Sequence, residues 1–481
     1  MNLLAFGWQW AGLQDYATNP AASAHPYLYI HHGNLGLYFS YGLARIGIVS
    51  IEAQNAVSWL ASLVGLMLAY LFVKETTRRR LPALLVLAFL ALDFRYIDDW
   101  ALNVHRAFTY MSVFGTALPF QRMLNDKVTP GRFTAFGVAS ALLLGADYMF
   151  FFFMFLLLSL MAALTNWRRL LPNIAILAAT FGALFALRQV QVFLGAGWNV
   201  WSHDFLYQIL NRFHLEWLFR GDWQQVTSDF YETNHILNPG FAPAVSWIER
   251  ISAFVSDTGG TFLTHVLNIG HYSTAALICG IALLGSIFVF ALKRDELSRL
   301  ALALLLACLA MYALFPRYFL QWYPEFLLGV ICVSVWLARL VEVLPTAAVA
   351  AAVALKVIVV AYGMASAQTD VNTQADILRR MAGQPIASNW TPSSVSSYTD
   401  AFAGWLKADA VDKLITTGRV EPSDYFMLFE ADRDNNPLYK SPRYFIFFKA
   451  YGTEAQLAAI RTKAQPSHET AVLAVFNVLP R

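Results

Sequence analysis

The sequence predicts a mainly α-helical, polytopic transmembrane bundle followed by a small C-terminal extramembrane α/β domain. Of the 481 residues, 58% are hydrophobic and only 14% are charged, whereas about a quarter of the residues of soluble domains are charged. The mean hydropathy is +0.49. The separate domain is predicted by the composition, because the chain becomes markedly more polar after about Asp370.

Ten apolar runs are long enough, or nearly so, to cross a hydrocarbon core of roughly 30 Å. Two of them would form one continuous block if Gly145 and Asp147 did not interrupt it at "GADY". The predicted crossings are residues 55–73, 81–95, 105–121, 131–145, 147–164, 171–190, 271–292, 298–315, 319–338 and 345–365.

Lysines and arginines predict the orientation, because short cytoplasmic loops carry an excess of them. They concentrate on one side of the predicted bundle, in "KETTRRR" (74–80), "QRMLNDKVTPGR" (121–132), "NWRR" (166–169), "KRDELSR" (293–299) and Arg339. This side is predicted to be cytoplasmic. The opposite, outer side then receives residues 1–54 with their surface helices, the long loop 191–270 of the transmembrane domain 55–366, and the α/β domain 367–481.

The start of the chain conflicts with this assignment. Residues 1–54 would lie outside, yet "MNLLAFGWQWAGL" is short and has no basic n-region that could carry them there. We therefore expect one further helix upstream of Met1, which gives eleven crossings. The alternative is that a short N-terminal tail crosses the membrane unaided.

The tail predicts strands and helices of a small domain. Alternating or continuous apolar runs predict strands at "PIASN" (385–389), "DYFMLFEA" (424–431), "RYFIFFKA" (443–450) and "AVLAVFNVL" (471–479). Helical spacing predicts helices at "QADILRRMA" (374–382), "SYTDAFAGWLK" (397–407) and "EAQLAAIRTKA" (454–464).

Two classes of site have no support in the sequence. The three cysteines, Cys279, Cys308 and Cys332, all lie inside apolar runs, so neither a disulfide framework nor a CxxC metal site is available. The net charge of +3 is small and reflects the loops, so it gives no argument for nucleic acid as a partner.

The stretch "HPYLYIHHGNLG" (25–36) is the first candidate for chemistry. It places His25, His31 and His32 on the predicted outer face, shortly after the carboxylate of Asp15. Such a cluster at the bilayer surface has the residue types of a general base or a metal ligand set. The structural alternative is an interfacial belt, in which Tyr and His lie at headgroup level and Pro and Gly form turns.

Two later segments add acidic and cationic candidates. "RYIDDWALNVHR" (95–106) holds Asp98, Asp99, His105 and Arg106, and "FPRYFLQWYP" (315–324) holds Arg317 and Tyr318. Arg317 is the only cation of its predicted outer loop. A phosphate ligand or a pairing with Asp98 or Asp99 explains it equally well.

Four further polar residues are weaker candidates. His203, Asp204 and Asp257 lie in the long outer loop, where isolated polar residues are usually solvated. Asp147 is an acid near membrane depth, which favours function, unless its turn lies at the outer surface.

The order of these motifs resembles that of the polytopic GT-C glycosyltransferases, the group of the protein O-mannosyltransferases and the aminoarabinose transferases. In that group an acidic residue in the first outer loop precedes a His-Pro turn and a surface helix. A second acidic residue follows in the next outer loop, and an Arg-Tyr or His-Tyr precedes a late aromatic and proline stretch. The chain departs from the group where "HHGNLG" replaces His-Pro-Pro-Leu, so the matching histidine is His31 or His32.

The resemblance implies an inverting glycosyltransferase that uses a polyprenyl-phosphate-linked sugar as donor. Asp15 would be the base, the structural alternative being an N-cap or turn role, and Asp98 and Asp99 would be further acidic candidates. The partners implied are membrane lipid, the donor, and an acceptor glycan, lipid or protein, at the outer face of a bacterial inner membrane. A divalent metal has no support in the sequence.

Two other classes of function compete with this one. A transporter or flippase of a lipid-linked glycan would also need many helices, but no internal repeat is evident. A scaffold subunit acting through its outer tail would leave the order of Asp15, Asp98, Asp99 and Arg317 unexplained.

Overall fold

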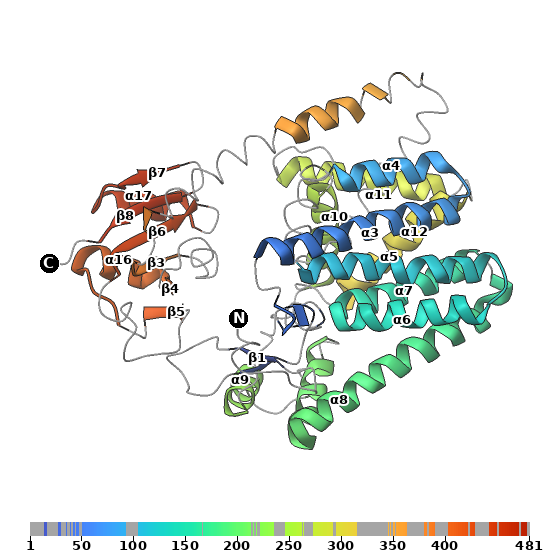
Figure 1. Ribbon diagram of the computed structural model, residues 1–481, viewed down its shortest axis with the longest axis horizontal. Coiled ribbons are helices and arrows are strands. Elements are labelled where there is room, and N and C mark those ends of the chain that lie inside the picture. The colour runs from blue at the N-terminus through green and yellow to red at the C-terminus, as the bar shows by residue number, and fades with distance from the viewer. Residues whose placement is uncertain are drawn as a thin grey trace. The chain divides into compact units, whose positions relative to one another are not determined.

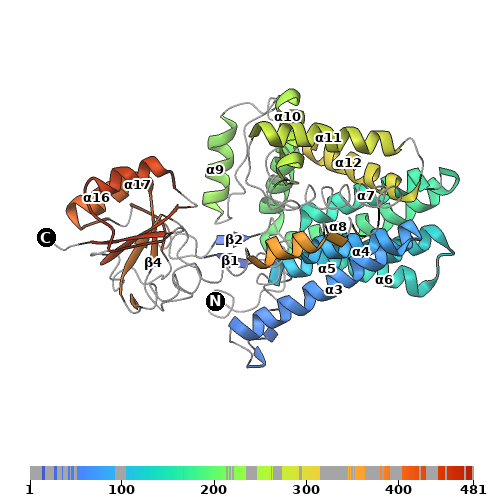
Figure 2. The ribbon, with the colours of Figure 1, turned by 90° about the horizontal axis from the view of Figure 1, so that it is seen from above.

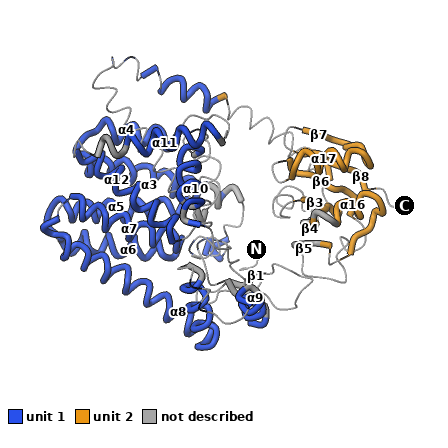
Figure 3. The backbone as a smooth tube through the Cα atoms, turned by 180° about the vertical axis from the view of Figure 1, so that it is seen from behind, with its two compact units in different colours: residues 1–14, 29–361 blue, residues 15–28, 362–481 orange. Residues whose placement is uncertain are grey.

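The computed structural model divides into two compact units, residues 1–14 with 29–361 and residues 15–28 with 362–481 (Figure 3). We refer to them as unit 1 and unit 2. The structure describes residues 14–16, 27–29, 35, 39, 42–43, 45–47, 51–92, 104–165, 167–212, 215, 218, 222–234, 246–261, 263, 273–291, 295–314, 345, 347, 350–351, 353–362, 380–381, 384–389, 403–421, 424–428, 442–449, 452–470 and 473–478.

Unit 1 is helical, and its long helices lie side by side (Figure 1). They are α3 (Ile51–Thr77), α4 (Arg80–Ala91), α5 (Val104–Asn125), α6 (Pro130–Ala146), α7 (Tyr148–Thr165), α8 (Leu170–Arg212), α9 (Trp223–Thr233), α10 (Trp247–Thr261), α11 (Ser273–Ala291) and α12 (Glu296–Leu314). The predicted apolar runs within the described residues coincide with helices. The run 319–338 lies outside the described residues.

Four helices are long and apolar enough to cross a membrane, counted over the described residues. They are Ala56–Thr77, Tyr148–Thr165, Trp167–Leu194 and Glu296–Leu314. Three shorter apolar helices, Arg80–Ala91, Thr274–Ser286 and Val353–Tyr362, accompany them. The predicted mainly helical membrane fold is therefore confirmed, and the number of crossings stays a prediction.

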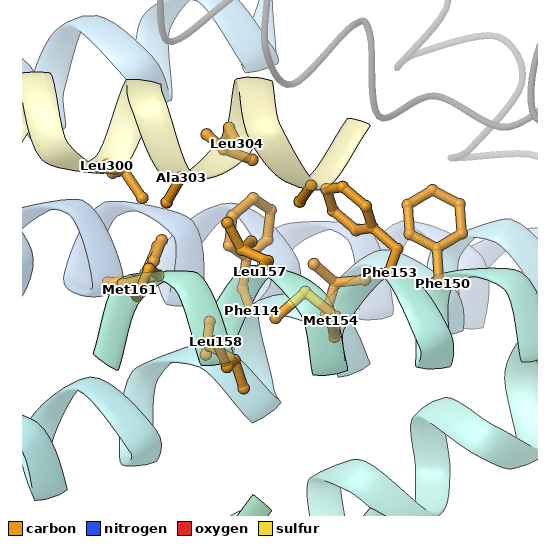
Figure 4. Close-up of a cluster of buried hydrophobic side chains, with 14 of the residues drawn as sticks. Phe114, Phe150, Phe153, Met154, Leu157, Leu158, Met161, Leu300, Ala303 and Leu304 are labelled. Atoms are coloured by element: carbon orange, nitrogen blue, oxygen red, sulfur yellow. The ribbon is translucent and has the colours of Figure 1, made fainter. Parts of the chain in front are cut away.

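The core of unit 1 lies between α7 and α12. Figure 4 shows Leu300, Ala303 and Leu304 of α12 facing α7, where Leu157 and Met161 lie in the same buried cluster. Of the apolar window of α12, 61% is buried, compared with 17% for that of α8. Helix α12 is therefore central to the bundle, whereas α8 presents an apolar surface suited to lipid.

Small residues allow three helices to approach closely. A Cβ added at Gly65 of α3 would lie 3.3 Å from the backbone N of Met111 in α5, and one added at Gly115 of α5 would lie 3.5 Å from the Cβ of Ala139 in α6. Close backbone approach through small residues is typical of helices that pack within a membrane. Gly115 in the "FGTALPF" stretch of α5 thus allows α5 and α6 to pack closely.

Two of the predicted cytoplasmic loops, 74–80 and 121–132, meet at one end of the bundle, which we call the basic end. Arg122 at the end of α5 pairs with Glu75 at the end of α3, with Nε and Oε1 3.4 Å apart. Arg132 at the start of α6 donates to the backbone carbonyl of Arg122 at 3.2 Å. Because successive helices run in alternating directions, the starts of α3 and α5 and the turn between α6 and α7 belong to the opposite end.

Helix α8 is longer than the predicted crossing 171–190 and contains a break. Gly197 has φ 85° and ψ 168°, a conformation outside the helical region that favours glycine. The helix therefore consists of two segments, and the second lies in the predicted outer loop, as do α9 and α10. The sequence signal for this break is the "GAG" at 195–197.

Two short strands lie in the region where surface helices were predicted. Strand β1 (Gln14–Tyr16) pairs with β2 (Tyr27–Tyr29) in a two-stranded sheet. Within the described residues, the first helical one is Leu35. The aromatic residues of "HPYLY" suit a strand because large, flat side chains pack well on a pleated surface.

Unit 2 is an α/β domain with a six-stranded sheet in the order β5-β4-β3-β6-β8-β7. The strands are β3 (Ile386–Ser388), β4 (Ala403–Leu406), β5 (Tyr425–Leu428), β6 (Tyr444–Phe448), β7 (His468–Glu469) and β8 (Leu473–Asn477). Strand β3 pairs in parallel with β4 and β6, and the other pairs are antiparallel.

Two helices of unit 2 cover one face of this sheet, as Figure 2 shows. They are α16 (Ala408–Thr417) and α17 (Glu454–Arg461). Successive residues of β6 alternate between the faces, because Phe445 and Phe447 pack under the helices and Ile446 packs on the other side. This alternation follows from the two-residue period of a strand.

One predicted helix of unit 2 is wrong. The segment "SYTDAFAGWLK" was expected to be helical, but Ala403–Leu406 forms β4 between β3 and β5. Pairing on both sides and the burial of Leu406 outweigh the local helical spacing. The four predicted strands and the helix at 454–464 are confirmed, whereas 374–382 lies mostly outside the described residues.

Candidate functional site

The predicted site residues are only partly within the described structure. Asp15 is the middle residue of β1, and His105 and Arg106 occupy the first turn of α5, where the structure describes the backbone and not these side chains. The others lie outside the described residues: His25, His31, His32, Asp98, Asp99, Arg317 and Tyr318.

The turn between α6 and α7 provides the best-defined polar group at the end opposite the basic end. Asp147 is fully buried and has extended backbone, with φ −156° and ψ 119°. Its Oδ1 accepts hydrogen bonds from the backbone N–H groups of Met149 at 2.8 Å and Phe150 at 3.1 Å. Asp147 therefore caps α7, and its carboxyl group lies at the positive end of that helix dipole.

A cation lies next to this turn. Arg188 of α8 donates from Nε to the hydroxyl of Tyr148, and from a guanidinium nitrogen to Oε1 of Gln191 at 2.9 Å. The Arg188 guanidinium also lies over the Tyr148 ring, 5.5 Å from its centroid. Arg188 falls inside the predicted crossing 171–190 and was not singled out. The signal that could have found it is a charge within an apolar helix.

The chain that follows the histidine segment reaches the same end. A Cβ added at Gly145, two residues before Asp147, would lie 3.5 Å from the Cβ of Leu35. The ring of Phe39 packs against that of Phe108 in the second turn of α5, with centroids 4.9 Å apart. The residues just after "HPYLYIHHG" are thus in contact with the α6–α7 turn and with the start of α5.

The second segment of α8 carries an aromatic cluster. Trp198 is 67% exposed and its ring lies 5.1 Å from that of Trp201, which stacks on Phe205 at 5.6 Å. Trp201 donates from Nε1 to Gln189 at 2.9 Å. Exposed tryptophans with one polar anchor are typical of the membrane–water interface.

The weaker candidates have structural partners. The hydroxyl of Tyr231 donates to Asp204 Oδ1 at 2.7 Å, and burial together with the Asp204 charge raises the pKa of Tyr231. His203 stacks on Phe230 at 5.4 Å. Tyr312 of α12 donates to Asp257 Oδ2 at 3.3 Å. These contacts anchor α9 to α8 and α10 to α12.

A resident metal would need clustered ligands. Within the described part of the chain, no three His, Cys, Asp or Glu side chains gather to hold an ion. The histidine segment 25–32 lies largely outside that part.

These features define a multi-pass helical membrane protein in which Asp147, Arg188 and an aromatic cluster lie at the end of the bundle opposite the basic end. Neither a protein-family model nor a curated protein sequence matches the chain. Solved structures similar to it include the archaeal oligosaccharyltransferase AglB from Archaeoglobus fulgidus in complex with an inhibitory peptide and a dolichol-phosphate. The two chains are 15% identical in sequence and superpose with a TM-score of 0.44. The match covers 94% of this chain and 65% of AglB.

Two further structures are similar. One is the Archaeoglobus fulgidus oligosaccharyltransferase in complex with Zn and sulfate, with 12% identity, a TM-score of 0.43, and coverage of 90% of this chain and 61% of that one. The other is ArnT from Cupriavidus metallidurans bound to undecaprenyl phosphate, with 13% identity, a TM-score of 0.34, and coverage of 98% and 94%. The chain thus spans less than two thirds of either oligosaccharyltransferase chain.

Proposed function

We propose that the protein is a membrane glycosyltransferase that moves a sugar from a polyprenyl-phosphate donor to an acceptor on the outer face. One observation carries this proposal. The helix ends that flank the predicted polar motifs belong to one end of the bundle, opposite the basic end. Leu35 and Phe39 contact that end, α5 begins there with His105 and Arg106, and α12 runs towards it.

The placement suits the chemistry of a lipid-linked sugar. The isoprenoid of such a donor stays in the bilayer, and its phosphodiester lies at the surface, so the enzyme needs a base and a cation at headgroup level. An apolar bundle that carries acidic and cationic candidates next to the helix ends opposite its basic end is suited to this arrangement. A transporter would instead be expected to concentrate polar groups near the midplane.

The roles assigned to the residues follow from the reaction. The acceptor oxygen forms a bond to the anomeric carbon while the bond between that carbon and the phosphate oxygen breaks. Asp15 takes the acceptor proton, with Asp98 and Asp99 as further acidic groups. Arg317 stabilises the charge of the departing polyprenyl phosphate. Tyr318, His25, His31 or His32, His105 and Arg106 contact the substrates.

The test is a transfer assay on the purified full chain. Radiolabelled polyprenyl-phosphate sugars are supplied with candidate acceptors, and the label is followed into the acceptor and away from the lipid. We expect transfer that depends on the lipid-linked donor. A chain that moves labelled lipid across a liposome bilayer without any transfer would contradict the proposal and favour a flippase.

A further inference from the structure

The turn between α7 and α8 presents exposed apolar and basic side chains. Helix α7 starts at the end opposite the basic end, so the turn that follows it belongs to the basic end. Residues Trp167–Arg169 form this turn as a short 3-10 helix, and none of its three side chains is buried. Trp167 is 74% exposed, and Leu171 in the first turn of α8 is 81% exposed. Tryptophan beside basic residues is typical of the membrane–water boundary.

The length of the apolar span places this turn at headgroup depth. The span Trp167–Leu194 comprises 28 residues, which at 1.5 Å per residue amounts to about 42 Å. This length matches the roughly 40–45 Å of a bilayer with its headgroup layers. Only 17% of the apolar window of the span is buried inside the protein, so its surface is suited to lipid. The turn at its start therefore lies next to lipid headgroups.

The two arginines of the turn have no acidic partner within the described residues. Arg168 and Arg169 are exposed, and neither makes an ion pair or a hydrogen bond in that part of the chain. Arg122 at the same end is neutralised, because it pairs with Glu75. In addition, the sequence 148–203 contains no aspartate or glutamate. The turn therefore carries two positive charges that an external anion can neutralise.

These features indicate the chemical class of the ligand. Guanidinium groups bind phosphate through paired N–H donors, and basic clusters next to a membrane helix attract anionic lipids. A headgroup with a net negative charge suits two unpaired arginines better than a zwitterionic headgroup, whose ammonium or choline group would face charges of the same sign. Phosphatidylglycerol has the phosphodiester and no cation.

We propose that the turn Trp167–Arg169 binds the headgroup of an anionic phospholipid such as phosphatidylglycerol. The phosphate contacts Arg168 and Arg169, and the acyl chains pack against Leu171. This binding holds the start of α8 at the membrane surface, away from the proposed catalytic end, and does not depend on the proposed function. It agrees with the predicted cytoplasmic side of the basic end, because that leaflet carries anionic lipids.

The test measures lipid binding to the purified full chain by native mass spectrometry, with short-chain phosphatidylglycerol, phosphatidylcholine and phosphatidylethanolamine as probes. Phosphatidylglycerol is expected to bind most tightly. Arg168→Gln and Arg169→Gln should each weaken its binding by roughly fivefold, and the double variant by roughly thirtyfold, from the usual contribution of one basic residue next to an anionic lipid surface. Binding of phosphatidylcholine should stay nearly unchanged.

The matched control is the double variant Arg80→Gln/Lys127→Gln. It removes two exposed cations of the basic end, neither of which adjoins a tryptophan in the sequence, and it should keep the preference for phosphatidylglycerol. An equal loss in this control would show a diffuse effect of charge and overturn the proposal, as would equal binding of the three lipids. If the double variant of the turn fails to fold, as judged by its melting temperature, the two single variants decide the matter.

A soluble competitor separates a lipid from a free phosphate ester. Glycerophosphoglycerol has the headgroup of phosphatidylglycerol without the acyl chains, so it should compete much more weakly than the short-chain lipid. Competition as strong as that of the lipid would assign the turn to a soluble anion and overturn the proposal.

Discussion

Asp147 illustrates how one side chain sets the geometry of the proposed catalytic end. Because its Oδ1 accepts from the N–H groups of Met149 and Phe150, Asp147→Ala should destabilise the protein by about 1 kcal/mol through loss of the cap. Asp147→Asn keeps an equivalent acceptor and should destabilise the protein less than Asp147→Ala does. Hydrogen exchange at the first turn of α7 measures both, and equal exchange in the two variants would contradict the capping role.

At the same scale, Glu469 makes unit 2 sensitive to acid. A hydrogen bond from Lys449, supported by Arg461, holds the pKa of Glu469 below its ordinary value. A lowered pKa stabilises the fold above the carboxyl's unfolded pKa, and this stabilisation is lost as the pH falls through the folded pKa.

Acidification should therefore raise amide exchange in residues 454–478 of the full chain. Exposed ion pairs of this kind are weak, so Glu469→Gln should reduce the acid-induced rise by roughly two- to fivefold. Glu421→Gln, which changes an exposed carboxylate elsewhere in unit 2, serves as the control. An unchanged acid response in Glu469→Gln would show that Glu469 is not the titrating group.

At the scale of elements, the crossing of α10 and α11 depends on two glycines. A Cβ added at Gly280 would lie 2.0 Å from the carbonyl oxygen of Val255, and one added at Gly259 would lie 1.7 Å from that of Ala276. Either distance is too short for a carbon, so the helices would have to separate. Gly280→Ala should therefore lower the melting temperature in detergent.

Gly285→Ala is the matched control in the same helix, because an added Cβ there meets no atom within 4 Å. Removing a helical glycine in open space should be neutral or stabilising, by up to about 1 kcal/mol. Equal melting temperatures for the Gly280 and Gly285 variants would refute the close crossing.

The elements also show what the sequence could and could not predict. Apolar length alone locates α3, α7 and α12, because a membrane leaves a helix few alternatives. Strand β4 was missed because its pairing with β3 is a non-local interaction that "AFAGWL" does not encode. Arg188 was missed because it lies near the end of the predicted crossing 171–190 and so does not interrupt the apolar run, and its Tyr148 partner is 40 residues away.

For the molecule as a whole, the orientation of the bundle in the membrane can be tested by cysteine labelling. In a variant without the native cysteines, His203→Cys in the second segment of α8 and Ala455→Cys in unit 2 occupy exposed positions on predicted outer segments. Arg168→Cys occupies an exposed position at the basic end. The positive-inside rule predicts that a membrane-impermeant maleimide labels the first two in intact cells.

Arg168→Cys should label only after permeabilisation. Labelling of Arg168→Cys alone in intact cells would show that the orientation is the opposite one. Labelling of His203→Cys but not of Ala455→Cys would show that unit 2 does not lie on the outer face.

If Asp15 is the base in sugar transfer, its carboxylate must be essential for turnover but not for folding. The rate of transfer from a polyprenyl-phosphate donor is compared between the wild type, Asp15→Asn and Asp229→Asn, an exposed carboxylate of α9 that serves as the control. Loss of a general base should lower turnover by roughly 10²–10⁴-fold in Asp15→Asn with an unchanged melting temperature. Near-normal turnover in that variant would contradict the assignment.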